Sequence, residues 1–246
     1  FAEKPLAVDA TETRALCDLA QGAHVLLCPV HQYAFQPALE RIIAQQSRIG
    51  AMELIEMRYF SAGAVGAAAK DLPRIAADNL PHPIAIAQRL WPERPLDALD
   101  WHVTPVGTAG WQMTAAVGAV TLRITLSLAA RPTEASLVLY GDKGAWEADL
   151  FHGYARFRDG TASRRSKALR PFGDALSVLR HASVNMAGRA LRREPAYPGL
   201  RALTAAFYAA IAGRGAAPIG VDQAIAVAVL LDFFLSQTAQ TEAREL

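Results

Sequence analysis

The sequence predicts an α/β protein, with the end of a parallel, doubly wound sheet at residues 1–30 and an α+β domain with a large, mainly antiparallel open sheet at residues 31–246. Three observations support this fold class. Before residue 31, a strand end, a helix pattern and an apolar strand pattern follow one another, which is the order of a βαβ unit. Six short strand patterns separated by turn residues then lie between residues 99 and 158. The last third of the chain contains only helix patterns.

The composition is that of an ordinary globular protein, with 246 residues of which 52% are hydrophobic and 20% charged. The net charge of +2 gives no overall reason to expect a nucleic acid or a membrane as partner. Cys17 and Cys28 lie in apolar segments without the spacing of metal ligands, which is typical of buried thiols in a reducing compartment. We therefore expect a cytoplasmic protein without a metal site. No signal-peptide pattern opens the chain, and the apolar run at residues 224–231 is too short to span a bilayer.

The first thirty residues contain one helix and one strand pattern. Asp9 followed by Glu12 is a capping-box pattern and predicts a helix that ends at Gly22. Its inner face is expected to hold Leu16, Leu19 and Ala20. Residues 24–30 are almost wholly apolar, as in a strand buried on both faces. Because the chain starts at Phe-Ala-Glu-Lys-Pro, like the end of a strand running into a turn, we expect it to begin inside a longer sequence.

Hydrophobic periodicity and turn residues place the remaining elements. Helices are predicted at residues 36–46, 80–91, 171–193, 198–212 and 221–237. Strands are predicted at residues 51–60, 99–106, 111–116, 119–128, 134–140, 145–150 and 153–158. The last helix is hydrophobic nearly all round, so we expect it to be buried.

The segment from Asp78 to His82 joins a carboxylate and an imidazole at the start of the helix predicted at residues 80–91. We place Asp78 in a loop, Asn79 at the N-cap and His82 in the first turn, where Pro81 is tolerated. The positive end of the helix dipole disfavours an imidazolium there, so a neutral His82 could accept a proton. Spacing alone favours the alternative that the pair is only a polar cluster at a helix start.

Four segments of the chain occur in the order found in one enzyme family. They are Glu3-Lys4-Pro5, the stretch from His31 to Ala38 (His-Gln-Tyr-Ala-Phe-Gln-Pro-Ala), Asp78-x-x-x-His82, and the hairpin sequence of residues 139–144. In order and spacing they resemble the Gfo/Idh/MocA (glucose–fructose oxidoreductase / inositol dehydrogenase / rhizopine catabolism) family of NAD(P)-dependent oxidoreductases. The resemblance spans essentially the whole chain. It implies that residues 1–30 are the tail of a dinucleotide-binding Rossmann domain and residues 31–246 a substrate and dimerisation domain.

The resemblance also implies a reaction. It is the transfer of a hydride between a nicotinamide, of NAD or NADP, and a secondary alcohol of a sugar-like or cyclic polyol substrate. Lys4 would lie near the nicotinamide ribose and the reacting hydroxyl and would polarise that hydroxyl. His82 would be the acid/base, and Asp78 would orient the substrate or His82. In this context we favour the functional interpretation of Asp78 and His82.

The binding residues follow from the same resemblance. Glu3, Lys4 and Pro5 would contact the cofactor, while His31 and Tyr33, with Asp78, would line the substrate cleft. A polar pair such as His31 and Tyr33 at a domain junction is as often structural. The resemblance further implies a homodimer that pairs through the exposed face of the sheet.

Two features depart from this pattern. No Gly-x-Gly-x-x-Gly segment lies between a strand and a helix, so we expect the chain by itself to bind NAD(P) poorly and to be inactive. Basic residues outnumber acidic ones between residues 156 and 193, which could serve an anionic substrate, although a solvated helix face is the favoured interpretation.

Two other functions stay open on the sequence alone. The chain could be a non-catalytic truncated homologue that acts as a ligand- or partner-binding module. It could also belong to a hydrolase or lyase that uses a bound nicotinamide as a transient redox cofactor.

Overall fold

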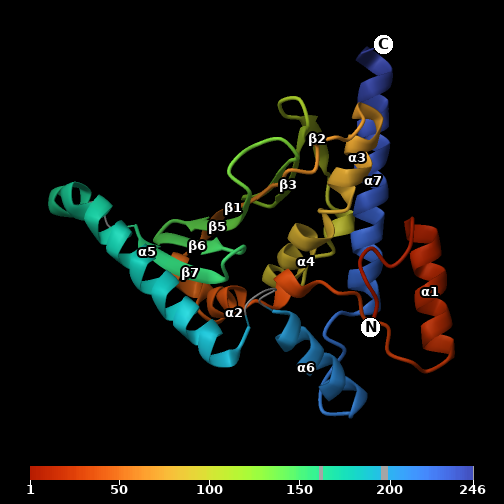
Figure 1. Ribbon diagram of the computed structural model, residues 1–246, viewed down its shortest axis with the longest axis horizontal. Coiled ribbons are helices and arrows are strands. Elements are labelled where there is room, and N and C mark those ends of the chain that lie inside the picture. The colour runs from red at the N-terminus through yellow and green to blue at the C-terminus, as the bar shows by residue number, and fades with distance from the viewer. Residues whose placement is uncertain (161–162, 195–198, 246) are drawn as a thin grey trace.

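The computed structural model describes residues 1–160, 163–194 and 199–245, and its centre is a seven-stranded sheet in the order β2-β3-β4-β1-β5-β6-β7 (Figure 1). The strands are β1 Met52–Phe60, β2 His102–Pro105, β3 Gly110–Val117, β4 Val120–Ser127, β5 Glu134–Gly141, β6 Gly144–Asp149 and β7 Tyr154–Asp159. Only β1 and β4 pair in parallel among these strands, and the other neighbours are antiparallel. The mainly antiparallel sheet and its strands are therefore confirmed.

Helices cover one face of the sheet and leave much of the other open (Figure 1). They are α1 Ala10–Gly22, α2 Pro37–Ala44, α3 Leu72–Ala77, α4 Pro81–Leu90, α5 Arg164–Arg192, α6 Leu200–Ile211 and α7 Val221–Glu245, with a short 3₁₀ helix, η1, at Gln32–Phe35. Along β1, Ile55, Met57 and Tyr59 point inward and are buried, as the two-residue period of a strand requires. They join Leu39 of α2 and Ile84 of α4 in one core.

Helix α1 forms as predicted, but with a different buried face. The Asp9 carboxylate accepts the backbone N–H of Glu12 at 2.8 Å, which confirms the N-cap. The buried residues are Thr13, Cys17 and Ala20. The prediction that Leu16 and Leu19 face inward is wrong, because these side chains are 40% and 70% exposed. The small side chains of the buried face let α1 pack closely against α7.

The strand predicted at residues 24–30 is reduced to one parallel β-bridge, between Ala2 and Pro29. The N–H of Ala2 donates to Cys28 O at 3.0 Å, and the N–H of Val30 donates to Ala2 O at 2.9 Å. Val25 is 60% exposed. A strand needs neighbouring strands for its N–H and C=O groups, and within the described residues the only β-bridge to this segment is the one with Ala2. The division into domains at residue 30 stays a prediction.

The start of α4 differs from the sequence prediction in its capping. A short helix that was not predicted, α3, precedes it, and Asp78 is the C-cap of α3 rather than a loop residue. Leu80, and not Asn79, occupies the N-cap position of α4. The Asn79 side chain instead donates to Ile75 O at 3.0 Å. Because α3 and α4 abut, Leu80 stays in helical backbone geometry and leaves no extended residue to act as a side-chain cap.

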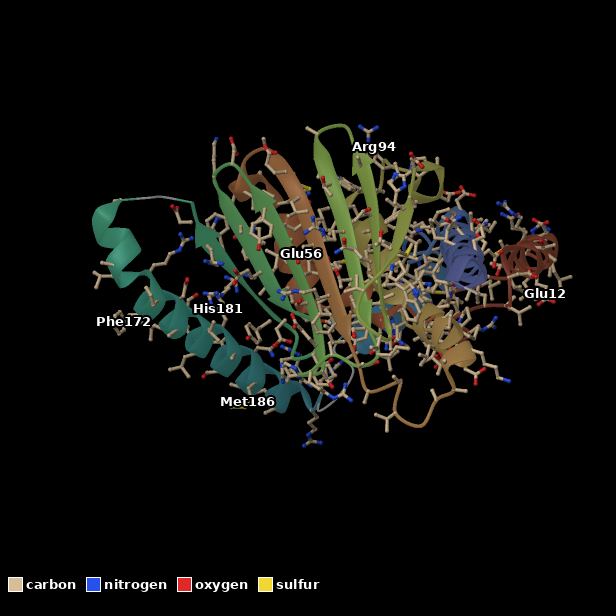
Figure 2. All side chains as sticks on the ribbon, turned by 90° about the horizontal axis from the view of Figure 1, so that it is seen from above. Glu12, Glu56, Arg94, Phe172, His181 and Met186 are labelled. Atoms are coloured by element: carbon tan, nitrogen blue, oxygen red, sulfur yellow. The ribbon has the colours of Figure 1, made fainter. Side chains whose placement is uncertain are left out.

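Helix α5 begins at Arg164, seven residues before the predicted start, and Pro171 lies inside it. It lies along the outer side of β7, where Asp174 pairs with Arg156 at 3.0 Å and with Arg158 at 3.7 Å. Its outward side carries exposed apolar side chains, among them Phe172 and Met186 on the side away from the strands (Figure 2). The full exposed set is Leu169, Phe172, Leu176, Leu179, Val184, Met186 and Leu191.

The two C-terminal helices complete the core. Helix α6 is confirmed from Leu200, while Pro198, the predicted start, lies outside the described residues. Helix α7 is longer than predicted and packs against α1, α3 and α4, burying Leu230 and Phe234. Among the described helices, only its stretch Val221–Gln240 is long and apolar enough to cross a membrane, with a mean hydropathy of 1.3. Half of that stretch is buried within the fold, as expected of a core helix.

Candidate functional site

Lys4 reaches the junction of α3 and α4. Its ammonium donates a hydrogen bond to the backbone oxygen of Asp78, 74 residues away in the sequence. The side chain is half-buried, and this burial lowers the pKa of Lys4, while the charges of Asp78 and Glu3 act in the opposite direction. Glu3 itself is exposed, and Pro5 follows Lys4 through a cis peptide bond. The fold thus brings together Lys4 and Asp78, two residues that the sequence analysis singled out separately.

His82 is the second residue of α4, in the first turn where it was predicted. Its side chain is 9% exposed and its Nδ1 has no hydrogen-bond partner among the described residues. Burial first, then the positive charge of Lys4 and the nearby His31, lower the pKa of His82 to about 3. The imidazole is therefore neutral at physiological pH, as expected, but burial is the main cause rather than the helix dipole.

His31 lies just before η1 and is 2% exposed. Its Nδ1 also lacks a partner within the described chain. Burial and the charge of Lys4 lower the pKa of His31 to about 4. Buried polar atoms in proteins are nearly always hydrogen-bonded, so two buried Nδ1 atoms without partners near one ammonium are unusual for a purely structural cluster.

Tyr33, in η1, connects His82 to the sheet through its ring. The ring centroids of Tyr33 and His82 are 4.6 Å apart, and those of Tyr33 and Tyr59 are 6.3 Å apart, both in edge-on geometry. Gly199, at a φ of +97°, packs against η1 so closely that a Cβ would lie 2.1 Å from Gln32 O. This close approach fixes the turn that presents Tyr33.

A cavity of about 140 Å³ lies beside His82. It is enclosed by η1, the junction of α3 and α4, the end of β1 and the start of β5. Its lining residues are Tyr33, Tyr59, Phe60, Ser61, Asn79, His82, Leu126, Leu128, Thr133, Glu134, Ala135 and Phe151. Of the predicted site residues, Tyr33 and His82 line this cavity.

The carboxylate of Asp78 lies elsewhere. It is exposed and borders a separate small crevice together with Pro5, Arg74 and Asp232. No hydrogen bond joins Asp78 to His82 within the described residues. The contact of Asp78 with the site is the one its backbone oxygen makes with Lys4.

Sequence reasoning missed Tyr59, Glu134 and Phe151 as cavity residues. For Tyr59 a signal existed, because it continues the inward-facing alternation of Ile55 and Met57 and places a hydroxyl on an apolar face. Glu134 and Phe151 gave no comparable signal. They reach the cavity only because β5 pairs with β1 and the chain turns after β6.

Two larger hollows lie next to α5, and the smaller of the two shares Thr133, Glu134, Ala135 and Phe151 with the cavity beside His82. One of about 870 Å³ and one of about 550 Å³ share Asp149, His152 and Tyr154. Arg156 and Arg158 nearby are paired with Glu147 and Asp174. These pairs support the interpretation of this part of the basic segment as structural rather than as a binding site for an anion. The side chains of residues 164–167 lie outside the description.

No protein-family model matches the chain, and no curated protein matches its sequence. Solved structures resemble it at low sequence identity. The WlbA dehydrogenase from Bordetella pertussis, in complex with NADH and UDP-GlcNAcA, has a TM-score of 0.66 at 12% identity, over 97% of this chain and 70% of its own. The UDP-N-acetylglucosamine 3-dehydrogenase GnnA from Acidithiobacillus ferrooxidans has a TM-score of 0.60 at 16% identity, over 96% and 67%. An oxidoreductase from Agrobacterium radiobacter, in complex with NAD⁺, L-tartaric acid and magnesium, has a TM-score of 0.65 at 13% identity, over 97% and 70%.

These neighbours are oxidoreductases of the type that the sequence motifs indicated. The chain spans between 67% and 70% of the length of these three solved chains. At sequence identities this low, the structural similarity establishes a shared fold and nothing more. The chain therefore has the fold of the glucose–fructose oxidoreductase / inositol dehydrogenase / rhizopine catabolism oxidoreductases.

Proposed function

We propose that this chain belongs to an NAD(P)-dependent oxidoreductase that transfers a hydride between a nicotinamide and a secondary alcohol of a sugar-like or cyclic polyol substrate. The observation that carries the proposal is the convergence of Lys4 with two buried histidines, His31 and His82, whose Nδ1 atoms lack partners within the described residues. The neighbours support it, because WlbA was solved with NADH and a sugar nucleotide and the Agrobacterium enzyme with NAD⁺ and a hydroxy acid.

The residues fit the reacting end of a nicotinamide cofactor. Glu3, Lys4 and Pro5 are proposed to contact it, since Lys4 is half-buried and its ammonium lies close enough to lower the pKa of both histidines. When bound, the nicotinamide supplies the acceptor or donor of the hydride. Lys4 polarises the substrate hydroxyl, and neutral His82 accepts its proton during oxidation and returns it during reduction.

The remaining predicted residues take supporting roles. Asp78 holds the Lys4 ammonium through its backbone oxygen, and its charge favours the protonated form of Lys4. These contacts support a role for Asp78 in positioning Lys4, rather than in orienting His82. Tyr33 binds the substrate from the wall of the cavity, and buried His31 supports the site from behind it.

The alternative of a non-catalytic binding module is less well supported. A module that binds through its sheet has no use for neutral histidines with unpartnered nitrogens beside a buried cavity. The homodimer and the cytoplasmic location, both implied at the sequence level, stay predictions.

Reduced-cofactor absorbance tests the proposal in the full-length protein, with NAD⁺ or NADP⁺ and a panel of polyols and sugars. We expect His82→Gln to lower kcat about 10²- to 10⁴-fold, because it removes the proton acceptor. Lys4→Met should cause a loss of similar size, whereas Lys70→Met, at an exposed lysine after β1, should leave turnover unchanged. Turnover that survives Lys4→Met and His82→Gln, or a protein that reduces neither cofactor with any of the substrates, would contradict the proposal.

A further inference from the structure

We propose that the outward side of α5 is a docking surface for an anionic membrane. The apolar side chains of α5 enter the lipid interface there, and its basic residues are attracted by the anionic headgroups. The inference does not depend on the hydride transfer, and it adds a partner that the net charge of the whole chain gave no reason to expect.

The first observation is that α5 turns its polar side toward the fold. Its partly buried residues recur at intervals of three and four, as on one side of a helix, and include Asp174, Val178, His181, Asn185 and Gly188. On this side Asp174 pairs with Arg156 at 3.0 Å, and Asn185 and Arg189 donate to His152 O at 2.8 Å and 2.9 Å. An amphipathic helix of a globular protein normally buries its apolar side instead. Helix α5 therefore has an apolar side that the fold does not use.

The second observation is the apolar stripe on the opposite side of α5. We call it the outer stripe, and it consists of Leu169, Phe172, Leu176, Leu179 and Met186, at intervals of three, four, three and seven residues. These side chains are between 63% and 75% exposed. Figure 1 shows α5 at the outer edge of the molecule, with the strands on its inner side. The outer stripe is therefore a ridge and not a groove, and a continuous exposed apolar patch of this kind marks an interaction surface.

The third observation is the separation of charge between α5 and the rest of the chain. Helix α5 contains seven of the chain's 25 lysines and arginines but one of its 23 aspartates and glutamates. Its formal charge is thus +6 and that of the rest of the chain is −4, although the total is only +2. The one acidic residue of α5, Asp174, is paired with Arg156 and Arg158. An anionic surface would attract α5 and repel the rest of the molecule, so the outer stripe would face that surface.

Ridge shape and charge together favour a lipid surface over other occupants. A second copy of α5 would bring two helices of charge +6 side by side, which is unfavourable. A partner protein would need a groove that matches the ridge, whereas lipids adapt to its shape. Leucine, phenylalanine and methionine on one side of a helix that is rich in arginine are typical of a helix lying in the membrane interface. Because α5 is already folded and held by β7, binding would not have to pay for helix formation.

Co-sedimentation of the full-length protein with vesicles tests the inference, with vesicles of phosphatidylcholine alone and of equal parts phosphatidylcholine and phosphatidylglycerol. We expect at least about tenfold tighter binding to the mixed vesicles, and weaker binding as sodium chloride is raised. The double variant Leu176→Gln, Leu179→Gln should bind the mixed vesicles at least about tenfold more weakly. Leu16→Gln, Leu19→Gln is the matched control, because it changes two exposed leucines of α1 at the same spacing and should leave binding unchanged.

A second pair of variants tests the contribution of charge. Arg180→Gln, at an exposed arginine of α5, should weaken binding to the mixed vesicles about fivefold. Arg94→Gln removes the same charge at an exposed arginine that Figure 2 shows away from α5, and it should have no effect. Neither arginine lies in the core, so this pair still decides the inference if the leucine variants fail to fold.

Several outcomes would overturn the inference. Binding to neither kind of vesicle, equal binding to both kinds, or binding that persists in Leu176→Gln, Leu179→Gln would each contradict it. A molecular mass by light scattering that halves in this double variant would show that a second copy of the chain covers the outer stripe. Binding of an acidic amphipathic peptide without any binding to vesicles would assign the outer stripe to a partner protein.

Discussion

Burial keeps the two histidines of the site, His31 and His82, neutral. His31 and His82 are 2% and 9% exposed, and in the low-dielectric interior the charged imidazolium loses its hydration. Lys4 adds a positive charge beside both rings and lowers their pKa values further. The result is a pair of bases that stay neutral at physiological pH next to an ammonium.

This pair makes stability depend on pH. In the fold the pKa values are about 4 for His31 and about 3 for His82, below the ordinary value of 6.5. Between about pH 4 and 6.5 the unfolded chain therefore binds protons that the folded chain does not, so stability falls as the pH falls. We expect the free energy of unfolding to drop by up to about 1.4 kcal/mol per pH unit for each histidine.

Urea unfolding between pH 7 and pH 5 measures this dependence. In the double variant His31→Gln, His82→Gln, the free energy of unfolding should change clearly less with pH. The other histidines are present in both proteins, so their contributions cancel in the comparison. An equal slope in the double variant would show that other groups cause the acid sensitivity.

At the residue scale, the sequence motifs singled out Lys4, Tyr33 and His82, whose functional roles stay predictions, but did not show how these residues are arranged. Position in a motif identified the residues, because each stands at a turn or a helix start. It could not reveal that Asp78 turns its carboxylate away and meets Lys4 through its backbone, because that contact depends on where α3 ends. Tyr59 was missed because one tyrosine in an apolar strand looks like an ordinary core residue.

At the scale of elements, turn residues predicted the strands of the sheet well, whereas packing decided the outcome for residues 24–30 and for the buried face of α1. Gly118 and the Gly141–Gly144 turn separate strands of the sheet, and such turns act locally whatever the tertiary context. Residues 24–30 failed as a strand because strand formation depends on neighbours that no local pattern encodes. The same holds for Leu16 and Leu19 of α1, whose exposure depends on which side of the helix α7 approaches.

Helix α5 gives a test at this scale. Leu176 and Leu179 are 67% and 64% exposed, so these side chains bury little apolar surface and contribute little to the free energy of unfolding. We expect Leu176→Gln and Leu179→Gln each to change the free energy of unfolding by less than about 0.5 kcal/mol. Leu39→Ala, at a fully buried residue of α2, should cost about 2–5 kcal/mol as the matched core control. A large loss in the α5 variants, measured by urea unfolding, would show that the outward side of α5 is covered in solution.

At the scale of the whole molecule, α7 ties the first residues to the rest of the fold. Asp232 of α7 accepts the backbone N–H of Ala10 at 2.8 Å, at the start of α1 where N–H groups lack partners within the helix. The same carboxylate is favoured by the positive end of the α1 dipole. Through this contact α7 holds the segment that carries Lys4.

Removing that contact should loosen the N-terminal segment without unfolding the sheet. We expect Asp232→Ala to cost about 1.5–3 kcal/mol in α1 and to speed hydrogen exchange of the amides of residues 10–22 by tenfold or more. Asp232→Asn keeps an acceptor oxygen, so its exchange rates at residues 10–22 should lie between those of Asp232→Ala and those of the unmodified protein. Hydrogen exchange measured by mass spectrometry checks the result, and faster exchange spread evenly over the sheet strands would contradict it.

The pairing of Ala10 with Asp232 joins residues 222 positions apart, and it bears on how the protein reaches its folded state. Contacts of such separation form late, because a long loop must close before they return any free energy. During synthesis, the segment with Lys4 emerges long before α7 exists to hold it. The sheet can form in the interval, but the cluster of Lys4, His31 and His82 cannot be completed until α7 is present, so chains released early would be compact and open to proteolysis at residues 1–30.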